Sequence, residues 1–392
     1  MRIERVEIFD LHPQGLDFAF HPVVVRIHTS EGISGVGEVG LAYGCGHSAG
    51  AGMLENLADL LLGKNPLETE KRWDEMMANT FWGHSPGPVM YGGISAMDIA
   101  MWDIRGKYYG EPVYKLLGGP VRTRIRAYAS QVQFGWGAGP HLNLHHPDDL
   151  REVTRKMIDD GFDCVKINPI RYDKDGLFLP CLPEKVSASL ARAMVERVRA
   201  VREEGGEDLD ILVEFNCRAS VAAAVQLGKM LEELSCMYLE EPVPFMAMEN
   251  IRDVAAKIKI PLAGGERLYT RWQFLPYLQE RLIGLAQPDV GLTGGITEMK
   301  KICDLAQIFD VGVQSHVCGG PVAVAASLHI AAAVTNYTLH EHHVRCLKPA
   351  IRDIVLEDFQ PEGGSFALPD RPGIGVELND DVVNRSPKRV KV

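Results

Sequence analysis

The sequence contains no long apolar stretch, no paired-cysteine motif and no excess of basic residues. No run of 18 apolar residues occurs in the 392-residue chain, so we expect no membrane span. The first residues also lack the apolar core of a secretory signal peptide. The eight cysteines are scattered without C-x-x-C spacing, which is typical of reduced structural thiols. Together these absences predict a cytoplasmic protein.

The excess of acidic residues argues against a nucleic-acid partner for this chain. The formal net charge is −11, whereas nucleic-acid binding normally requires a basic surface. With 46% hydrophobic and 24% charged residues, the composition is that of an ordinary globular protein. An anionic substrate would therefore have to be held by local cations rather than by the field of the whole protein.

Residues 1–124 predict a separate α+β unit. The β-branched segment 21–28 and the segment 35–40 can pair as a hairpin around the turn at 31–32. Segment 35–40 also fits G-x-G-x-x-G, but the residues after it are too glycine-rich to begin the helix that a dinucleotide site requires. We expect a flexible loop over a site there. Helical patterns follow at 52–62, 66–79 and 92–106, and within the last we expect Asp98 and Asp103 to cap or pair rather than bind a ligand.

From residue 125 to about 356 the pattern alternates between strand and helix. The candidate strands number eight, at 124–130, 164–168, 211–216, 237–242, 261–266, 285–289, 312–316 and 338–342. The clearest helices lie between them, at 191–202, 221–233, 298–309 and 321–333. This alternation predicts an α/β fold, a modified (β/α)8 TIM-type barrel. We expect residues 357–392 to return to the N-terminal unit, so that the two segments together make a capping domain. We expect the basic tail 385–392 to be frayed.

Three glutamates end consecutive candidate strands at equal spacing. Twenty-six residues separate Glu214 from Glu240, and 26 separate Glu240 from Glu266, which is about the length of one βα unit. Their carboxylates should therefore lie side by side at the mouth of the barrel. Buried unpaired carboxylates are costly, and Mg²⁺ removes that cost because it prefers oxygen ligands. The spacing predicts a Mg²⁺ site.

The other strand ends also carry polar groups, and active sites of such barrels lie at these ends. Asp289 and His316 end adjacent strands, and a carboxylate beside an imidazole suits a general base. Lys166 would face this pair and contact a substrate carboxylate or an enolate oxygen. In the run 340–343, alternate residues of a strand face opposite ways, so we expect Glu341 to point inward and hydrogen-bond an intermediate rather than join a zinc site.

These motifs are similar to those of the enolase superfamily, mandelate racemase subgroup, nearly from end to end. The motifs are Leu-Glu-Glu-Pro at 239–242, Gly-Glu at 265–266, Gln-Pro-Asp at 287–289, Ser-His at 315–316 and Arg-Pro-Gly-Ile-Gly-Val-Glu-Leu-Asn at 371–379. The resemblance implies a capped barrel, a required Mg²⁺, a small carboxylate substrate and a homo-oligomer. It also implies that loops near residues 15–50 select the substrate, which makes Tyr43 and His47 candidate substrate-binding residues beside Asn168 and Asn216.

Departures from the subgroup's pattern bear on the reaction. Racemases of the subgroup carry Lys-x-Lys where this chain has Lys166-Ile-Asn168, and galactonate-type dehydratases carry a histidine where it has Asn216. The first ligand is Glu214, where aspartate is usual. One His–Asp pair remains, which favours dehydration of a sugar acid, an aldonate or aldarate, to a 2-keto-3-deoxy acid through a metal-stabilised enediolate. The alternatives are a racemase or epimerase with a base from His145, Arg171 or Tyr172, and a barrel that binds a ligand without turnover; a lesser possibility is lactone chemistry.

Overall fold

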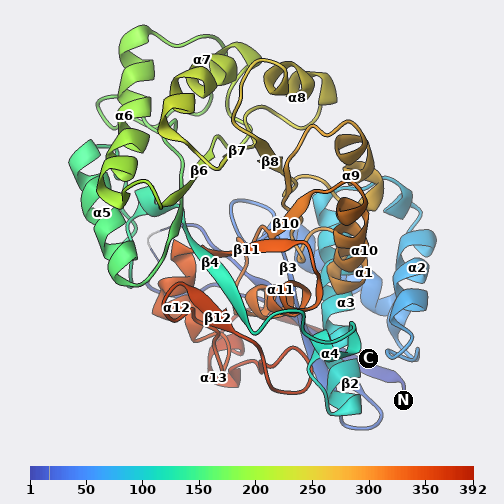
Figure 1. Cartoon of the computed structure of the whole chain (residues 1–392). Coiled ribbons are helices and arrows are strands. Elements are labelled where there is room, and N and C mark those ends of the chain that lie inside the picture. The colour runs from blue at the N-terminus through green and yellow to red at the C-terminus, as the bar shows by residue number, and fades with distance from the viewer. Residues whose placement is uncertain (17) are drawn as a thin grey trace.

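Eight parallel strands close into a barrel in the computed structural model, which describes residues 1–16 and 18–392. The barrel strands run in chain order, and β11 pairs with β4 to close the ring (Figure 1). Their bounds are β4 (Arg124–Ser130), β5 (Cys164–Ile167), β6 (Asp210–Glu214), β7 (Tyr238–Glu240), β8 (Leu262–Gly264), β9 (Leu285–Ala286), β10 (Gly312–Ser315) and β11 (Tyr337–His343). The predicted parallel barrel is confirmed.

Helices between the strands form the outer layer of the barrel (Figure 1). They are α5 (Pro147–Asp159), α6 (Ala188–Gly205), α7 (Val221–Leu231), α8 (Met248–Ala255), α9 (Thr270–Gln279), α10 (Gly295–Ile308) and α11 (Pro321–Ala333). The hydroxyls of Ser187 and Ser220 accept backbone hydrogen bonds at the starts of α6 and α7, as good N-caps do. The four helices predicted here are confirmed with small shifts at their ends. Among the described residues, no helix is long and apolar enough to cross a membrane.

The N-terminal part forms a four-stranded antiparallel sheet covered by helices. The strand order is β13-β1-β2-β3, with β1 (Ile3–Asp10), β2 (Val23–Thr29), β3 (Ser34–Val39) and β13 (Lys388–Lys391), and the helices are α1 (His47–Leu61), α2 (Thr69–Asn79) and α3 (Pro88–Tyr109). A Cβ atom at Gly35 or Gly37 would overlap the backbone carbonyl oxygens of Ala100 and Ala96 in α3. These glycines of the G-x-G-x-x-G pattern therefore let a helix pack closely on a strand.

Helix α3 joins this cap to the barrel. Asp98 accepts hydrogen bonds from the backbone N–H and the hydroxyl of Thr297, at 2.9 and 2.6 Å. Because Thr297 lies in the first turn of α10, Asp98 caps that helix. Asp103 accepts from the N–H of Val36 and pairs with Lys107, whose Nζ lies 3.0 Å away. The expectation that both aspartates cap or pair is confirmed, and the docking holds the end of β3 over the barrel.

The basic tail is not frayed, and that prediction is wrong. Residues 388–391 pair as β13 with β1 along the edge of the cap sheet. Three acidic side chains of the cap hold the tail through ion pairs, Glu7 with Lys388, Glu55 with Arg389 and Asp59 with Lys391. The basic charges that predict an exposed tail from the sequence are neutralised by acidic residues far away along the chain.

The segment between the barrel and the tail contacts both units. Strand β12 (Ser365–Ala367) pairs antiparallel with β4, whereas Ile374 donates its N–H to Asp103 in the cap. We propose 1–124, 125–356 and 357–392 as the units of the chain, the last joining the other two. The remaining short helices are α4 (Val113–Leu116), α12 (Pro349–Arg352) and α13 (Asp380–Val383).

Candidate active site

Three carboxylates converge at the C-terminal mouth of the barrel. Glu214 and Glu240 are the last residues of β6 and β7 and lie opposite each other in register. Glu266 follows the end of β8 by two residues. One carboxylate oxygen of each lies within 4.8 Å of the others. The structure thus brings together the three residues that the 26-residue spacing selects.

The local backbone positions these carboxylates. Asn216 adopts a left-handed conformation with φ 47°, which asparagine tolerates better than most residues. This turn directs its backbone N–H to Oε1 of Glu214, at 2.5 Å. On the neighbouring side, the amide of Gln287 donates to Oε2 of Glu240 at 2.6 Å. Two of the three carboxylates are therefore held by neighbours that point them into the barrel mouth.

The donor set fits a hard divalent cation. Oε2 of Glu214 is buried and has no hydrogen-bond partner among the described residues, although buried polar atoms are normally paired. Burial and the neighbouring carboxylate of Glu240 raise the pKa of Glu214 well above its usual value. A cation bound among these oxygens would reverse both effects, and the all-oxygen set is the one that Mg²⁺ prefers. Glu214, Glu240 and Glu266 would hold it.

A buried lysine lies against the same carboxylates. Nζ of Lys166 lies 2.7 Å from Oε1 of Glu240 and 3.0 Å from Oε1 of Glu341. Burial alone would lower the pKa of Lys166, but these two carboxylates outweigh it and raise that pKa well above its usual value. Glu341 also accepts from the hydroxyl of Ser130 and, at 2.8 Å, from the N–H of Val317. Lys166 therefore lies in a buried ion-pair cluster with these carboxylates.

Asp289 and His316 form a hydrogen-bonded pair at the ends of adjacent strands. Nδ1 of His316 donates to Oδ2 of Asp289 at 2.7 Å, and Nε2 lies 3.1 Å from Oε2 of Glu266. The other oxygen of Asp289 accepts from the N–H of Gly291 at 2.7 Å. Burial alone would lower the pKa of His316, but Glu266 and Asp289 raise it well above its usual value. Asp289 fixes the ring so that Nε2 faces the carboxylate of Glu266.

These groups open into a cavity of about 260 Å³. Lys166, Glu266, His316 and Glu341 line it together with Asn216 and Tyr43. Asn168 lies one layer behind, where its amide donates to Oδ1 of Asn216 at 2.7 Å. His47 lies outside the cavity lining, because α1 begins at this residue and its ring pairs with Asp10 of β1. The structure therefore does not place His47 in the lining of this cavity.

Sequence reasoning missed most of the cations that line this cavity. Four arginines contribute to the lining, Arg171, Arg218, Arg267 and Arg345. Arg267 is paired with Glu241 and Glu266, whereas the other three have no carboxylate within ion-pair distance in the described part of the chain. Arg218, Arg267 and Arg345 each follow a strand-end glutamate by one to four residues, which is the signal that could have found them.

The run 340–343 alternates as a strand should. His340 contacts the hydroxyl of Ser327, with Nε2 2.6 Å from Oγ, and His342 stacks on Phe162. Glu341 and His343 instead line the cavity. The inward placement of Glu341 agrees with the expectation, and His343 is a further lining residue that the sequence analysis did not select.

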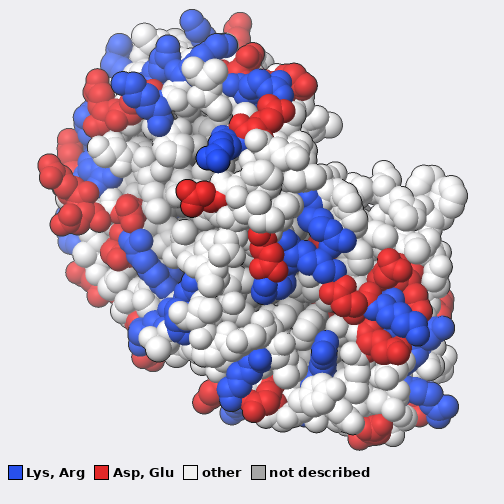
Figure 2. All heavy atoms as spheres, turned by 45° about the vertical axis from the view of Figure 1, so that its right-hand side comes forward, with Lys and Arg blue, Asp and Glu red and all other residues white. Residues whose placement is uncertain are grey.

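On the face in Figure 2, acidic and basic side chains are interspersed around a broad uncharged area. The cations that can hold an anionic ligand are those inside the cavity, at the mouth of a capped parallel barrel whose strand ends carry a carboxylate triad and a His–Asp pair.

That architecture is the one of the enolase superfamily, and comparison with known proteins agrees. Residues 149–382 match the model of the enolase C-terminal domain-like family. Residues 19–118 match the N-terminal domain of mandelate racemase and muconate lactonizing enzyme. The chain belongs to the mandelate racemase/muconate lactonizing enzyme family of this superfamily, whose enzymes use a divalent metal ion, usually Mg²⁺.

Relatives of this chain carry the names of sugar-acid dehydratases. The chain is 33% identical to arabinonate dehydratase of Saccharolobus solfataricus over 368 residues, 93% of this chain and 91% of that one. It is 35% identical to D-galactonate dehydratase of Verminephrobacter eiseniae over 367 residues, 92% of this chain and 89% of that one. A solved enolase-superfamily structure from Salmonella typhimurium superposes with a TM-score of 0.97 at 40% identity and full coverage of both chains.

Proposed function

We propose that this protein is a Mg²⁺-dependent lyase that dehydrates a sugar acid to a 2-keto-3-deoxy acid. The observation that carries the proposal is the convergence of three carboxylates, Lys166 and the Asp289–His316 pair on one cavity. When bound by the three glutamates, the ion would supply positive charge that stabilises an enediolate as it forms. The dehydratase names of the relatives support the same reaction class.

The side chains of the cavity can be assigned roles from their contacts. Asp289 holds the proton on Nδ1 of His316, so in the neutral ring, once a cation on Glu266 offsets the negative charge that favours the protonated form, the lone pair of Nε2 would take the α-proton of the substrate. The Cβ–O bond then breaks, and the same Nε2–H protonates the departing hydroxyl, which leaves as water on the same face. The resulting enol becomes the 2-keto acid by moving one proton from oxygen to carbon. Lys166 stays protonated and provides a fixed positive charge beside the reacting carboxylate.

The unpaired arginines favour an acid with two anionic ends. The guanidinium groups of Arg171 and Arg218 each lie 5.2 Å from the centroid of the Phe178 ring. Burial lowers the pKa of Arg218, and the charge of Arg171 lowers it further. Two neighbouring cations without a carboxylate partner among the described residues can attract an anion. We therefore propose aldarates, which carry a second carboxylate, over aldonates as substrates.

The test is a turnover assay on a panel of aldonic and aldaric acids. The purified protein with Mg²⁺ is incubated with each acid, and 2-keto acids are detected with semicarbazide. His316→Asn should lower turnover by about 10²–10⁴-fold, the usual contribution of a general acid or base. His146→Ala, an exposed histidine outside the cavity lining, is the control and should keep full activity. Turnover that survives His316→Asn, or no turnover on any acid, would contradict the proposal.

The same samples in D₂O separate the alternatives. Exchange of the α-hydrogen without elimination would indicate a racemase or epimerase, and binding without exchange would indicate a silent barrel. Racemisation needs a base on the second face of the substrate. Of the three candidate bases, only Arg171 lines the cavity. Tyr172 and His145 instead contact Asn143, so we do not propose racemisation.

A further inference from the structure

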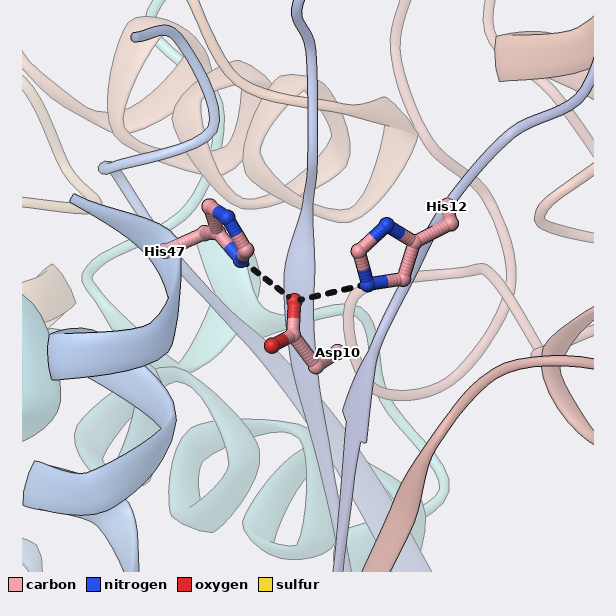
Figure 3. A group of neighbouring side chains, drawn as sticks. All are labelled: Asp10, His12 and His47. Atoms are coloured by element: carbon pink, nitrogen blue, oxygen red, sulfur yellow. Dashed lines mark hydrogen bonds and ion pairs between the residues drawn. The ribbon is translucent and has the colours of Figure 1, made fainter. Parts of the chain in front are cut away.

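A second group of metal-ligating side chains lies in the cap, outside the cavity lining. It consists of Asp10, His12 and His47, with His21 beside them. Asp10 ends β1, His21 lies just before β2, and His47 begins α1. Figure 3 shows the carboxylate of Asp10 between the rings of His12 and His47. The dehydratase reaction uses none of them.

The donor atoms of this cluster converge. Oδ1 of Asp10 lies 2.7 Å from Nδ1 of His47 and 3.8 Å from Nε2 of His12 (Figure 3). The ligand atoms of all three residues lie within 4.8 Å of one another. A tetrahedral ion with bonds of 2.0–2.1 Å needs ligand atoms about 3.3 Å apart. Small rotations of two side chains would therefore satisfy it.

His21 supplies the second, independent observation. Its ring centroid lies 4.7 Å from that of His12 and 4.6 Å from that of His47. Its Nδ1 is buried and has no hydrogen-bond partner among the described residues.

We propose that Asp10, His12 and His47 bind a borderline divalent transition-metal ion of the Zn²⁺ class, with the fourth position of the ion next to His21. Imidazole nitrogen selects such ions, whereas Mg²⁺ prefers oxygen. The two sites of the protein therefore differ in the metal that they take.

The proposed ion would fasten together segments of the cap that lie far apart in the sequence. His12 donates its backbone N–H to Ser386 and Asp10 donates its own to Pro387, both in the C-terminal tail. His47 follows the loop whose Tyr43 lines the cavity. An ion bound only by the folded state stabilises that state. Here it would hold β1, the start of α1 and, through them, the tail.

The test titrates metal-free protein with Zn²⁺ by calorimetry in excess Mg²⁺, which keeps the carboxylate site filled. We expect one Zn²⁺ per chain. Co²⁺ under the same conditions should give the intense visible absorption of a tetrahedral ion. His12→Ala and His47→Ala should each weaken binding by at least about 10–100-fold, the cost of losing even an outer partner of a metal site. The matched control His146→Ala should bind as the unchanged protein does.

Each outcome of these titrations either supports or overturns the proposed Zn²⁺ site. His12 is exposed, so His12→Ala should stay folded, and circular dichroism checks this for both variants. No Zn²⁺ bound in excess Mg²⁺ would overturn the proposal. Zn²⁺ binding that survives His47→Ala would also overturn it, because the ion would then lie elsewhere. So would displacement of the bound Zn²⁺ by Mg²⁺ at comparable concentrations. Dehydratase activity is not part of the readout, so this result is independent of the proposed reaction.

Discussion

Replacing Asp289 by asparagine tests the role of the His–Asp pair directly. Oδ1 of Asp289 accepts from the N–H of Gly291 at 2.7 Å, so the amide oxygen of the asparagine should keep that place. Its NH₂ group then faces Nδ1 of His316, which can no longer donate and must accept. The proton moves to Nε2, and the nitrogen that should take the α-proton becomes a donor.

The loss should appear in kcat rather than in KM, because the substrate contacts remain. We expect about 10²–10⁴-fold, or roughly 2.7–5.4 kcal/mol at 1.36 kcal/mol per factor of ten. The lost charge-assisted hydrogen bond should lower the free energy of unfolding by only about 1.5–3 kcal/mol. Nitrogen NMR of the histidine rings reports which nitrogen of His316 carries the proton.

Asp304→Asn is the matched control, since Asp304 is an exposed aspartate of α10 paired with Lys300. It should leave kcat and the ring tautomer unchanged. Retention of more than a tenth of the kcat in Asp289→Asn would refute the reasoning. So would an unchanged proton position in His316.

The remaining predictions concern the metal and the stability of the cap. Dialysis against a chelator should abolish turnover, and Mg²⁺ should restore it, as the semicarbazide assay will show. Gly37→Ala should lower the free energy of unfolding by at least about 1–3 kcal/mol in urea titrations, because its Cβ would overlap a carbonyl oxygen of α3. Gly52→Ala, with open space in α1, should be neutral or stabilise by up to about 1 kcal/mol. Burial alone would raise the pKa of Glu7, but Lys388 and His28 outweigh it and lower that pKa to about 2. Because the folded state holds this proton less tightly than the unfolded chain, the stabilisation is complete above about pH 5 and is lost towards pH 2. The difference in thermal midpoint between the unchanged protein and Glu7→Gln should shrink over that range.

Strand ends could be predicted from the sequence because a strand and its return helix have a nearly fixed length. The equal intervals between Glu214, Glu240 and Glu266 therefore translate directly into neighbouring positions on the barrel. The same reasoning placed Asp289 beside His316. This reasoning used the repeat length of the βα units and the order of the strands in the barrel. Neither requires knowledge of where the side chains point.

Residues beyond the strand ends could not be placed in this way. Arg345 reaches the cavity because the chain turns into a 3₁₀-helix at Val344–Leu347 directly after β11. His47 turns away because α1 begins there and Asp10 is within reach. The basic tail found acidic partners more than 300 residues earlier in the chain. The position of each of these side chains depends on a backbone turn or on a contact with a distant residue, and neither can be predicted from the local sequence pattern.

The charges of the barrel mouth bear on the proposed metal ion and on the protein cations that would hold an acid substrate. Six largely buried carboxylates meet there, those of Glu214, Glu240, Glu241, Glu266, Asp289 and Glu341. Among the described residues, the lysine and arginine that contact them directly are Lys166 and Arg267. Burying such an excess of negative charge is costly, and a further anion could not approach it. A divalent ion held by the three glutamates would remove most of the excess and would compete with Lys166 for Glu240. Binding of such an ion would therefore neutralise the floor of the cavity and leave the lysine available to an acid substrate.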